Sequence, residues 1–274
     1  MNIGIIGNGF VGKATKILKC KDINVLIYDI IPELCEPYGI TIENFSICDL
    51  IFISVPTPMN DNGTCHLDIV ETVVRQLKNI LDKSKTQIVI RSTVIPGTCD
   101  KLETYFMPEF LTEKNYVNDF INCKEWIFGL LNQNIEIDNI FKKKITKLFS
   151  LAKQNSCIKH NNIFFVTNKE AELIKYIKNC YLATKVSFFN EIHEFCKKSN
   201  INFENVRKIA TMDDRIGQSH TMVPGPDGKK GFGGTCFLKD MCALKAEMDK
   251  IEMNSYILSA TINRNNKVDR SDND

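Results

Sequence analysis

The sequence lacks any apolar run long enough to cross a bilayer, which takes about 20 consecutive apolar residues, so we expect no transmembrane helix. It also lacks a basic leader. The opening stretch MNIGIIGNGFVG is apolar but broken by glycines, which is typical of a first strand and not of a signal peptide. Charge of one sign is absent too. The net charge of +2 gives no reason to expect nucleic acid or an acidic membrane surface as a partner.

Paired cysteines are absent as well. The chain has 11 cysteines, an odd number, and no two of them have CxxC spacing. Scattered cysteines of this kind are typical of free thiols in a reducing, cytoplasmic compartment, and they indicate neither a disulfide framework nor a zinc or other metal site. Internal repeats are also missing. With 274 residues of ordinary hydrophobic content, the chain is long enough for one large or two medium globular domains.

The first motif that is present is a dinucleotide-binding βαβ unit. An apolar strand is predicted at 2–6, and the GxGxxG of 7–12 opens a helix expected to reach about residue 20. A strand at 24–28 ends at Asp29, 20 residues after the second glycine, which is the spacing of an acid that binds ribose hydroxyls. A carboxylate there would repel a 2′-phosphate, which favours NAD over NADP. The residues expected to bind the cofactor here are Gly7, Gly9, Phe10, Val11, Gly12 and Asp29.

Further strands and helices alternate through the first half, as in a Rossmann-type doubly wound sheet. One strand ends in Pro56 and Thr57, and another ends in Ser92 and Thr93. Such sheets bind ligands at the carboxyl ends of their strands, so these hydroxyls would face the same crevice, although a Ser or Thr there is as often a simple helix cap. The predicted elements are a helix at 68–81 and strands at 50–55, 87–91, 126–130 and 163–166.

Two glutamates follow an apolar segment at 105–110. Glu109 and Glu113 are four residues apart, so they would share a face if the segment is helical. Two carboxylates with this spacing are more often a solvated face than a site.

The second half has a helical pattern with a long central helix. Thr167 and Glu170 have capping-box spacing, and an apolar stripe continues from there to about residue 198. Lys175 and Asn179 lie one turn apart on another face, where such a pair is usually plain polar surface. Further helices are predicted at 203–212 and from 240 to 268. We expect a Rossmann-type domain at 1–167, an all-helical domain at 168–268 and a polar tail at 269–274.

The stretch GFGGTCFLKD, residues 231–240, carries the strongest candidate for covalent chemistry. Cys236 follows a flexible glycine turn, and Lys239 and Asp240 come within the next helical turn. A helix N-terminus and a neighbouring cation both favour a thiolate, so this cysteine is expected to be a better nucleophile than an ordinary one. Most cysteines in such a chain are structural, but the glycines and the Lys-Asp pair favour a reactive one here.

Taken in order, the motifs resemble those of the UDP-glucose/GDP-mannose dehydrogenase family over nearly the whole chain. Lys239 fits the UDP-glucose branch better than the UDP-N-acetylhexosamine branch. The resemblance implies oxidation of a sugar C6 alcohol to a carboxylate by two hydride transfers to NAD. The matching stretches are GNGFVG with Asp29, SVPTP at 54–58, RSTVIPGT at 91–98, MPEFLTE at 107–113, AELIKYIKN at 171–179, FFNE at 188–191, DDRIG at 213–217 and GFGGTCFLKD.

The resemblance also implies catalytic roles. Cys236 would trap the intermediate aldehyde as a thiohemiacetal and then carry a thioester, which divides a four-electron oxidation into two steps. Lys175 would stabilise the C6 oxygen as it becomes alkoxide-like, and Asn179 would donate a hydrogen bond to the same centre. Asp240 and Thr93 would position or deprotonate the hydrolytic water.

The same resemblance extends to substrate contacts and assembly. Glu109 and Glu113 match an acidic pair that handles substrate, water or protons, and Arg215 matches an arginine that reaches across a dimer interface. A homodimer through the central helices is therefore expected. The implied substrate-binding residues are Glu109, Phe110, Leu111, Lys175, Asn179, Arg215 and Gly233, and Pro56, Thr57, Ser92, Thr93 and Lys239 join the cofactor set.

One departure from the family leaves alternatives open. Family members usually carry a third domain that forms much of the nucleotide pocket, and this sequence stops before it. We therefore expect weaker nucleotide binding, unless a partner supplies the wall. A non-catalytic NAD-binding subunit is one alternative. A 3-hydroxyacid dehydrogenase is another, but its chemistry needs no cysteine, so Cys236 discriminates against it.

Overall fold

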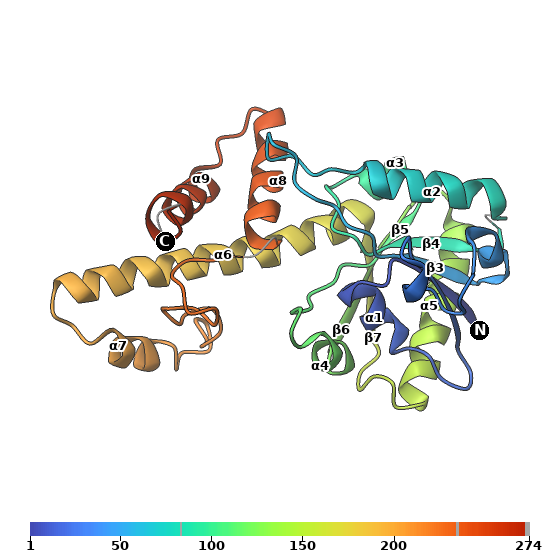
Figure 1. Ribbon diagram of the computed structural model, residues 1–274, viewed down its shortest axis with the longest axis horizontal. Coiled ribbons are helices and arrows are strands. Elements are labelled where there is room, and N and C mark those ends of the chain that lie inside the picture. The colour runs from blue at the N-terminus through green and yellow to red at the C-terminus, as the bar shows by residue number, and fades with distance from the viewer. Residues whose placement is uncertain (83, 234–235, 272–274) are drawn as a thin grey trace. The chain divides into compact units, whose positions relative to one another are not determined.

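The computed structural model describes residues 1–82, 84–233 and 236–271. Their contacts divide them into two compact units. Unit 1 comprises Met1–Pro58 and His66–Lys175, and unit 2 comprises Met59–Cys65 and residues 176–271. Unit 2 therefore includes one short segment, Met59–Cys65, that interrupts the sequence of unit 1. Figure 1 labels the elements along the chain.

Unit 1 is built on a seven-stranded sheet with strand order β2-β1-β3-β4-β5-β6-β7. All neighbouring strands pair in parallel except β5 and β6, which meet antiparallel at Phe106 and Gly129. The order reverses between β1 and β3, which is where doubly wound sheets bind ligands. The strands are β1 (Asn2–Ile6), β2 (Asn24–Tyr28), β3 (Leu50–Ile53), β4 (Gln87–Ile90), β5 (Tyr105–Phe106), β6 (Glu125–Leu130) and β7 (Asn162–Thr167).

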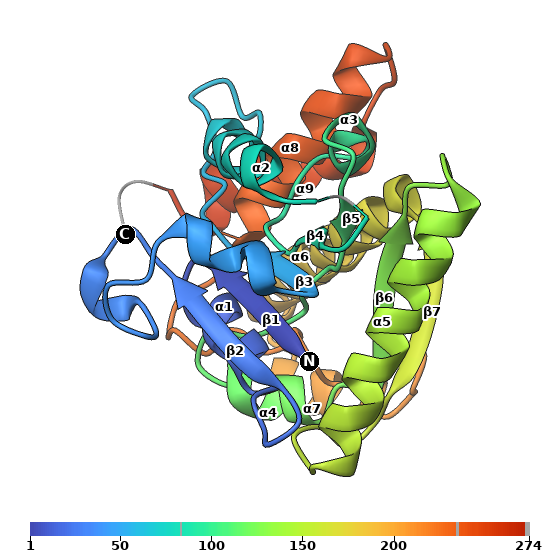
Figure 2. The same cartoon turned by 90° about the vertical axis from the view of Figure 1, so that its right-hand side faces the viewer.

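Helices cover both faces of this sheet (Figure 2), which confirms the expected Rossmann-type α/β architecture. One apolar layer joins the sheet to α1, α4 and α5, and the other joins it to α2, α3 and the start of α6. Strands β1 and β3 contribute to both layers and are buried on both faces, as their continuous apolar runs predict. The helices are α1 (Phe10–Lys16), α2 (Asp68–Ile80), α3 (Thr98–Lys101), α4 (Tyr116–Ile121) and α5 (Ile135–Gln154), with 3₁₀ turns η1 (Pro32–Leu34) and η2 (Ile42–Ile47).

The long helix α6 (Asn168–Lys198) begins in unit 1 and continues in unit 2. Its predicted capping box is present: the Thr167 N–H donates to Glu170 at 2.7 Å, and the Glu170 N–H donates to the Thr167 hydroxyl at 3.2 Å. The other elements of unit 2 are α7 (Phe203–Ala210), α8 (Cys236–Lys250), α9 (Tyr256–Arg264) and the π-helical turn η3 (Asn265–Asp269). The helical unit after the sheet is as expected.

Two expectations need correction, and one condition set by the sequence is not met. The first helix ends at Lys16 instead of near residue 20, because the chain turns back at Cys20 to pair with Ile23. The helical pattern from 240 to 268 is interrupted between α8 and α9, where Glu252 takes a left-handed conformation with φ of +58°. The segment 107–112 is irregular rather than helical, so Glu109 and Glu113 do not share a helix face.

Candidate functional site

The turn between β1 and α1 forms a cradle of backbone around Gly9. Gly7 has φ of +92°, and a Cβ there would lie 2.6 Å from the Ser54 carbonyl oxygen. A Cβ on Gly12 would lie 2.0 Å from the Gly7 carbonyl oxygen. Around Gly9, by contrast, no described atom comes within 4 Å of a built Cβ, and no described side chain caps α1. The first N–H groups of α1 are therefore available to a phosphate, which fits a bound dinucleotide. Phe10 and Val11, the first residues of α1, are half-buried beside this turn.

Asp29 lies next to this turn, at the end of β2. Its Oδ2 accepts a hydrogen bond from the Asn8 N–H at 2.6 Å, and its Oδ1 accepts one from the Ile31 N–H at 3.0 Å. The Asn8 amide in turn donates to the Leu34 carbonyl at 2.8 Å. The carboxylate is thus held beside the glycine turn with lone pairs left for ribose hydroxyls.

The ends of β3 and β4 lie on the same edge of the sheet. The Ser92 hydroxyl donates to the Val55 carbonyl at 2.7 Å, so it ties the two strand ends together. Thr57 is buried, Pro56 is exposed and Thr93 is half-buried. The structure therefore places these residues near the switch point, with Ser92 already engaged in a bond within the protein.

A buried ion pair joins α6 to the segment after β5. Lys175 Nζ lies 2.5 Å from Glu109 Oε1 and 2.7 Å from the Glu109 carbonyl oxygen. Both side chains are less than a tenth exposed. An ammonium has three donors, so Lys175 keeps one that these two bonds do not use. Its Nζ also lies 5.8 Å from the centre of the Phe110 ring.

The electrostatics of this pair favour the ionised carboxylate. Burial alone would raise the pKa of the Glu109 carboxyl. The Lys175 ammonium outweighs burial, with help from the Leu111 N–H at 2.9 Å and the Arg91 charge, so this pKa lies below its ordinary value. Glu113 is exposed and is not part of this pair.

Arg91 is a residue that the sequence reasoning missed. It is 2% exposed, its guanidinium donates to the Thr15 hydroxyl, and it lies 5.6 Å from the centre of the Phe120 ring. Burial lowers its pKa to about 10, and the Glu109 charge opposes that shift. Arg91 thus links the helix that follows the glycine turn to Glu109 electrostatically. Its place in RSTVIPGT, directly after a buried strand, was the available signal.

Glu172 is a second missed residue, one turn before Lys175 on α6. It is fully buried, and its carboxylate accepts hydrogen bonds from the N–H groups of Gly97 at 2.5 Å and Cys99 at 2.8 Å. Burial raises its pKa to about 7, although both hydrogen bonds oppose the shift. Glu172 therefore fixes the start of α3 against α6.

In unit 2, Asp240 is the centre of a second polar cluster. Its Oδ2 accepts a hydrogen bond from the Asn179 amide at 2.6 Å, and its Oδ1 pairs with Lys239 Nζ at 2.8 Å. Asp240 is 1% exposed. Three predicted residues are thus brought together, and each of the two carboxylate oxygens already has one partner.

Cys236 is the first residue of α8, one turn before Asp240. It is the exposed member of the 11 cysteines, all of which are free. Burial raises the pKa of the Cys48 and Cys180 thiols to about 12 and also raises that of Cys242. Those three thiols are therefore poor candidates for a nucleophile, whereas Cys236 is accessible at the start of a helix.

The remaining candidates lie on the surface of unit 2. The Arg215 guanidinium binds Asp213, with Nη2 at 2.6 Å from Oδ2, and its side chain is 90% exposed. Gly233 is exposed, and a Cβ there would lie 2.7 Å from an Arg270 nitrogen. Gly234, the last of the three glycines before Cys236, and residues 272–274 of the tail lie outside the described residues.

Among residues 1–82, 84–233 and 236–271, no three His, Cys, Asp or Glu side chains gather as a metal site. No helix in the described part of the chain is both long and apolar enough to cross a membrane.

Two family models match the chain. Residues 39–150 match the UDP-glucose/GDP-mannose dehydrogenase family, NAD binding domain, and residues 169–267 match the central domain of the same family. The first match begins after the glycine turn, so the fit of that turn to a dinucleotide rests on its geometry.

Individual proteins agree with these matches. UDP-glucose 6-dehydrogenase of Rickettsia prowazekii is 30% identical over 97% of this chain and 67% of its own length. Among solved structures, UDP-glucose dehydrogenase of Pyrobaculum islandicum has a TM-score of 0.79 at 23% identity, over 96% of this chain and 67% of that chain. The 3-hydroxyisobutyrate dehydrogenase of Mycobacterium tuberculosis has a TM-score of 0.72 at 13% identity, over 96% and 91%, a likeness of fold.

Proposed function

Because the chain belongs to the UDP-glucose/GDP-mannose dehydrogenase family, with its NAD-binding and central domains, we propose that it oxidises UDP-glucose to UDP-glucuronate. NAD, when bound, accepts the hydrides. The balanced reaction joins the C6 alcohol, one water and two NAD, and it yields the carboxylate, two NADH and three protons. The observation that carries this proposal is Cys236, the exposed thiol at the start of α8. A two-electron alcohol oxidation would have no use for it.

Lys175 acts on the first oxidation in this proposal. Its ammonium stabilises the C6 oxygen as the alcohol proton leaves, and the contact with Glu109 fixes the position of that ammonium. Asn179, one turn further along α6, has a second amide proton beyond the one given to Asp240, and it donates to the same oxygen. Glu113 is exposed and serves proton exchange with solvent, while Phe110 and Leu111 flank the sugar.

Cys236 carries the second oxidation. Its sulfur adds to the C6 aldehyde, an S–C bond forms, and the thiol proton passes to the former carbonyl oxygen to give a thiohemiacetal. Loss of the second hydride and of the hydroxyl proton leaves a thioester. Water then breaks the S–C bond and regenerates the thiol, with Asp240 and Thr93 positioning or deprotonating that water. Lys239 Nζ lies 2.8 Å from Asp240 Oδ1 and so fixes the orientation of that carboxylate.

We further propose that the chain forms a homodimer in the reducing cytoplasm. Large apolar side chains are exposed along one face of α6, and each is more than half accessible: Ile177, Tyr181, Phe188 and Phe195. A self-complementary stripe of this kind suits a second copy related by a twofold axis. Arg215 would then reach the partner's sugar, and 11 free thiols support a reducing location.

The test is the stoichiometry of NADH formation. We expect purified protein to form two NADH per UDP-glucose, and Cys236→Ala to lose the full oxidation while still binding NAD. A sugar adduct on Cys236, sought by mass spectrometry, tests the covalent step separately. No turnover at saturating UDP-glucose, with NAD still bound, would refute the enzyme proposal and favour a non-catalytic or partner-dependent subunit.

A further inference from the structure

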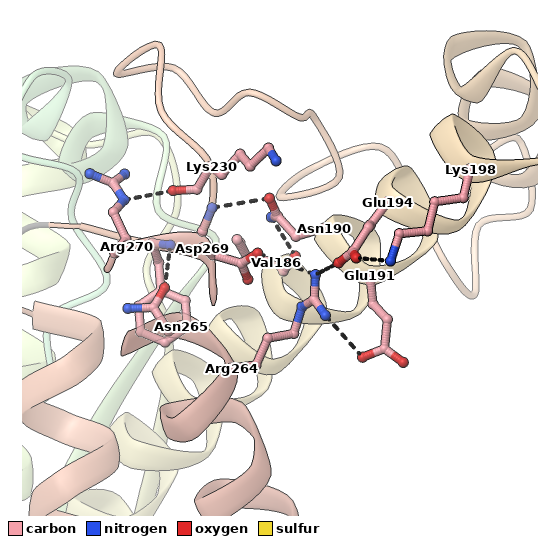
Figure 3. A network of polar contacts seen from close by, with 12 residues as sticks. Val186, Asn190, Glu191, Glu194, Lys198, Lys230, Arg264, Asn265, Asp269 and Arg270 are labelled. Atoms are coloured by element: carbon pink, nitrogen blue, oxygen red, sulfur yellow. Dashed lines mark hydrogen bonds and ion pairs between the residues drawn. The ribbon is translucent and has the colours of Figure 1, made fainter. Parts of the chain in front are cut away.

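Three consecutive backbone groups in the loop before α8 are each held by a side chain from elsewhere in unit 2 (Figure 3). Arg270 Nε donates to the Lys230 carbonyl at 2.6 Å. The Gly231 N–H donates to Asn190 Oδ1 at 3.1 Å. The Phe232 N–H donates to Asn265 Oδ1 at 2.9 Å. We call Asn190, Asn265 and Arg270 the loop clasp.

The clasp fits the loop closely. Gly231 has φ of +61°, and a Cβ there would lie 2.5 Å from Asn265 Oδ1 and 2.8 Å from the Asp269 Cβ. Asn190 and Asn265 are each at most 3% exposed. Buried amides with satisfied hydrogen bonds hold one geometry because any shift would leave a polar group without a partner.

The π-helical turn η3 positions two residues of the loop clasp, Asn265 and Arg270. The π-helical turn η3 closes with a hydrogen bond from the Arg270 N–H to the Asn265 carbonyl at 2.7 Å, which brings both side chains to the loop. Arg264 anchors this turn: its guanidinium lies 3.2 Å from Asp269 and 3.3 Å from Glu194 of α6. Arg270 also pairs with Asp227 at the far end of the loop.

The backbone at 230–232 is linked to the start of α8 by a contact between two aromatic rings. Phe232 is 5% exposed, and its ring packs edge-on against that of Phe237, with centroids 6.1 Å apart. Phe237 is the neighbour of Cys236 in the first turn of α8. Fixing the backbone at 230–232 therefore fixes the Phe232 ring, which in turn buttresses the turn that carries the thiol.

We propose that Asn190, Asn265 and Arg270 are positioning residues that set the place of Cys236 through the loop at 230–232. Their effect on turnover rests on the proposed function, whereas their effect on the loop and on the first turn of α8 does not. None of the three needs to touch the substrate. A nucleophile displaced by about 1 Å loses much of its rate, so the clasp contributes to the chemical step more than to binding.

Hydrogen exchange tests the physical part of this proposal on the full chain. In Arg270→Ala, we expect the Gly231 and Phe232 amides to exchange about tenfold faster, and the Asp240 and Met241 amides of α8 to exchange faster as well. Asn265→Ala should do the same, and it gives a second measurement if either variant folds poorly. The matched control is Lys250→Ala, which loses an exposed ion pair at the other end of α8 and should leave all four amides unchanged.

Kinetics test the consequence for the reaction. We expect Arg270→Ala to lower kcat about fivefold or more with a smaller change in KM, and Arg270→Lys, which keeps a donor for the Lys230 carbonyl, to recover part of the loss. Faster exchange confined to 231–232, with α8 unaffected, would overturn the positioning role. An unchanged kcat in a variant with a loosened α8 would overturn it too. A wild-type protein without turnover would refute the proposed function alone, because the hydrogen-exchange rates of the variants still test the positioning role of the loop clasp.

Discussion

At the scale of single residues, the pairing of Lys175 with Glu109 matters most for the proposed chemistry. A buried ammonium needs a counter-charge away from bulk water, and the Glu109 carboxylate lies 2.5 Å from Lys175 Nζ. The sequence placed Lys175 on the helix but did not indicate this partner. Glu109 is 66 residues away, in a segment without regular structure.

Removing the carboxylate charge should cost stability. Glu109→Gln keeps the shape but leaves the Lys175 ammonium buried without a counter-charge, so we expect the free energy of unfolding to fall by about 3 kcal/mol or more. Urea denaturation measures this. Glu113→Gln is the matched control, because Glu113 is exposed and its loss should change the free energy by less than about 0.5 kcal/mol.

The same pair predicts the sign of a pH effect. The folded pKa of Glu109 lies below its ordinary value of 4.5, so its contribution is present above that pH and is lost as the pH falls through the folded pKa. The stability difference between wild type and Glu109→Gln should therefore narrow below about pH 4.5. A difference that stays constant down to pH 3 would contradict the pairing.

At the scale of elements, the glycines of the turn between β1 and α1 serve two purposes: two are required by the fold, and one leaves room for a ligand. Gly7 and Gly12 are required by the protein itself, because a Cβ at either would collide with backbone. Gly9 faces open space in the described structure. The motif marks all three glycines alike, and only the packing distinguishes them.

Two alanine substitutions exploit this difference. Gly9→Ala should leave the melting temperature unchanged yet weaken NAD binding about tenfold or more, because its methyl group occupies the space for a phosphate. Gly12→Ala should destabilise the fold by about 1–3 kcal/mol, because its Cβ would lie 2.0 Å from the Gly7 carbonyl oxygen. Calorimetry and thermal melting measure the two effects. Equal losses of stability in both variants would refute the assignment.

Other elements show how far sequence could predict the fold. Every strand except the short β5 was predicted, and so was α6, because apolar runs and a long amphipathic stripe are clear signals. The helical pattern from 240 to 268 hid a break because apolar residues continue through the break, at Ile251 and Met253, while the backbone reverses at Glu252. The loop clasp was beyond prediction, since it joins side chains 33 to 41 residues from the backbone groups they hold.

At the scale of the whole molecule, the proposed homodimer depends on the exposed apolar stripe on α6. Phe188→Asp places a charge at the middle of the stripe, so we expect it to shift the protein from dimer to monomer in sedimentation experiments, with little change in the stability of the monomer fold. Met212→Asp is the matched control, as an exposed apolar residue away from that helix. A wild-type protein that is monomeric at assay concentrations would contradict the proposed dimer.

The connectivity of the two units has a consequence for biosynthesis. Segment Met59–Cys65 belongs to unit 2, and Gly63 packs close to Cys242, which is made 179 residues later. At a translation rate of about 5–20 residues per second, this segment is synthesised roughly 10 to 35 seconds before Cys242. The sheet of unit 1 can fold in the meantime, because unit 1 is complete at Lys175. Nascent chains paused before α8 should therefore have a folded sheet and an exposed segment at Met59–Cys65. In such chains, this segment should be accessible to chaperones and proteases.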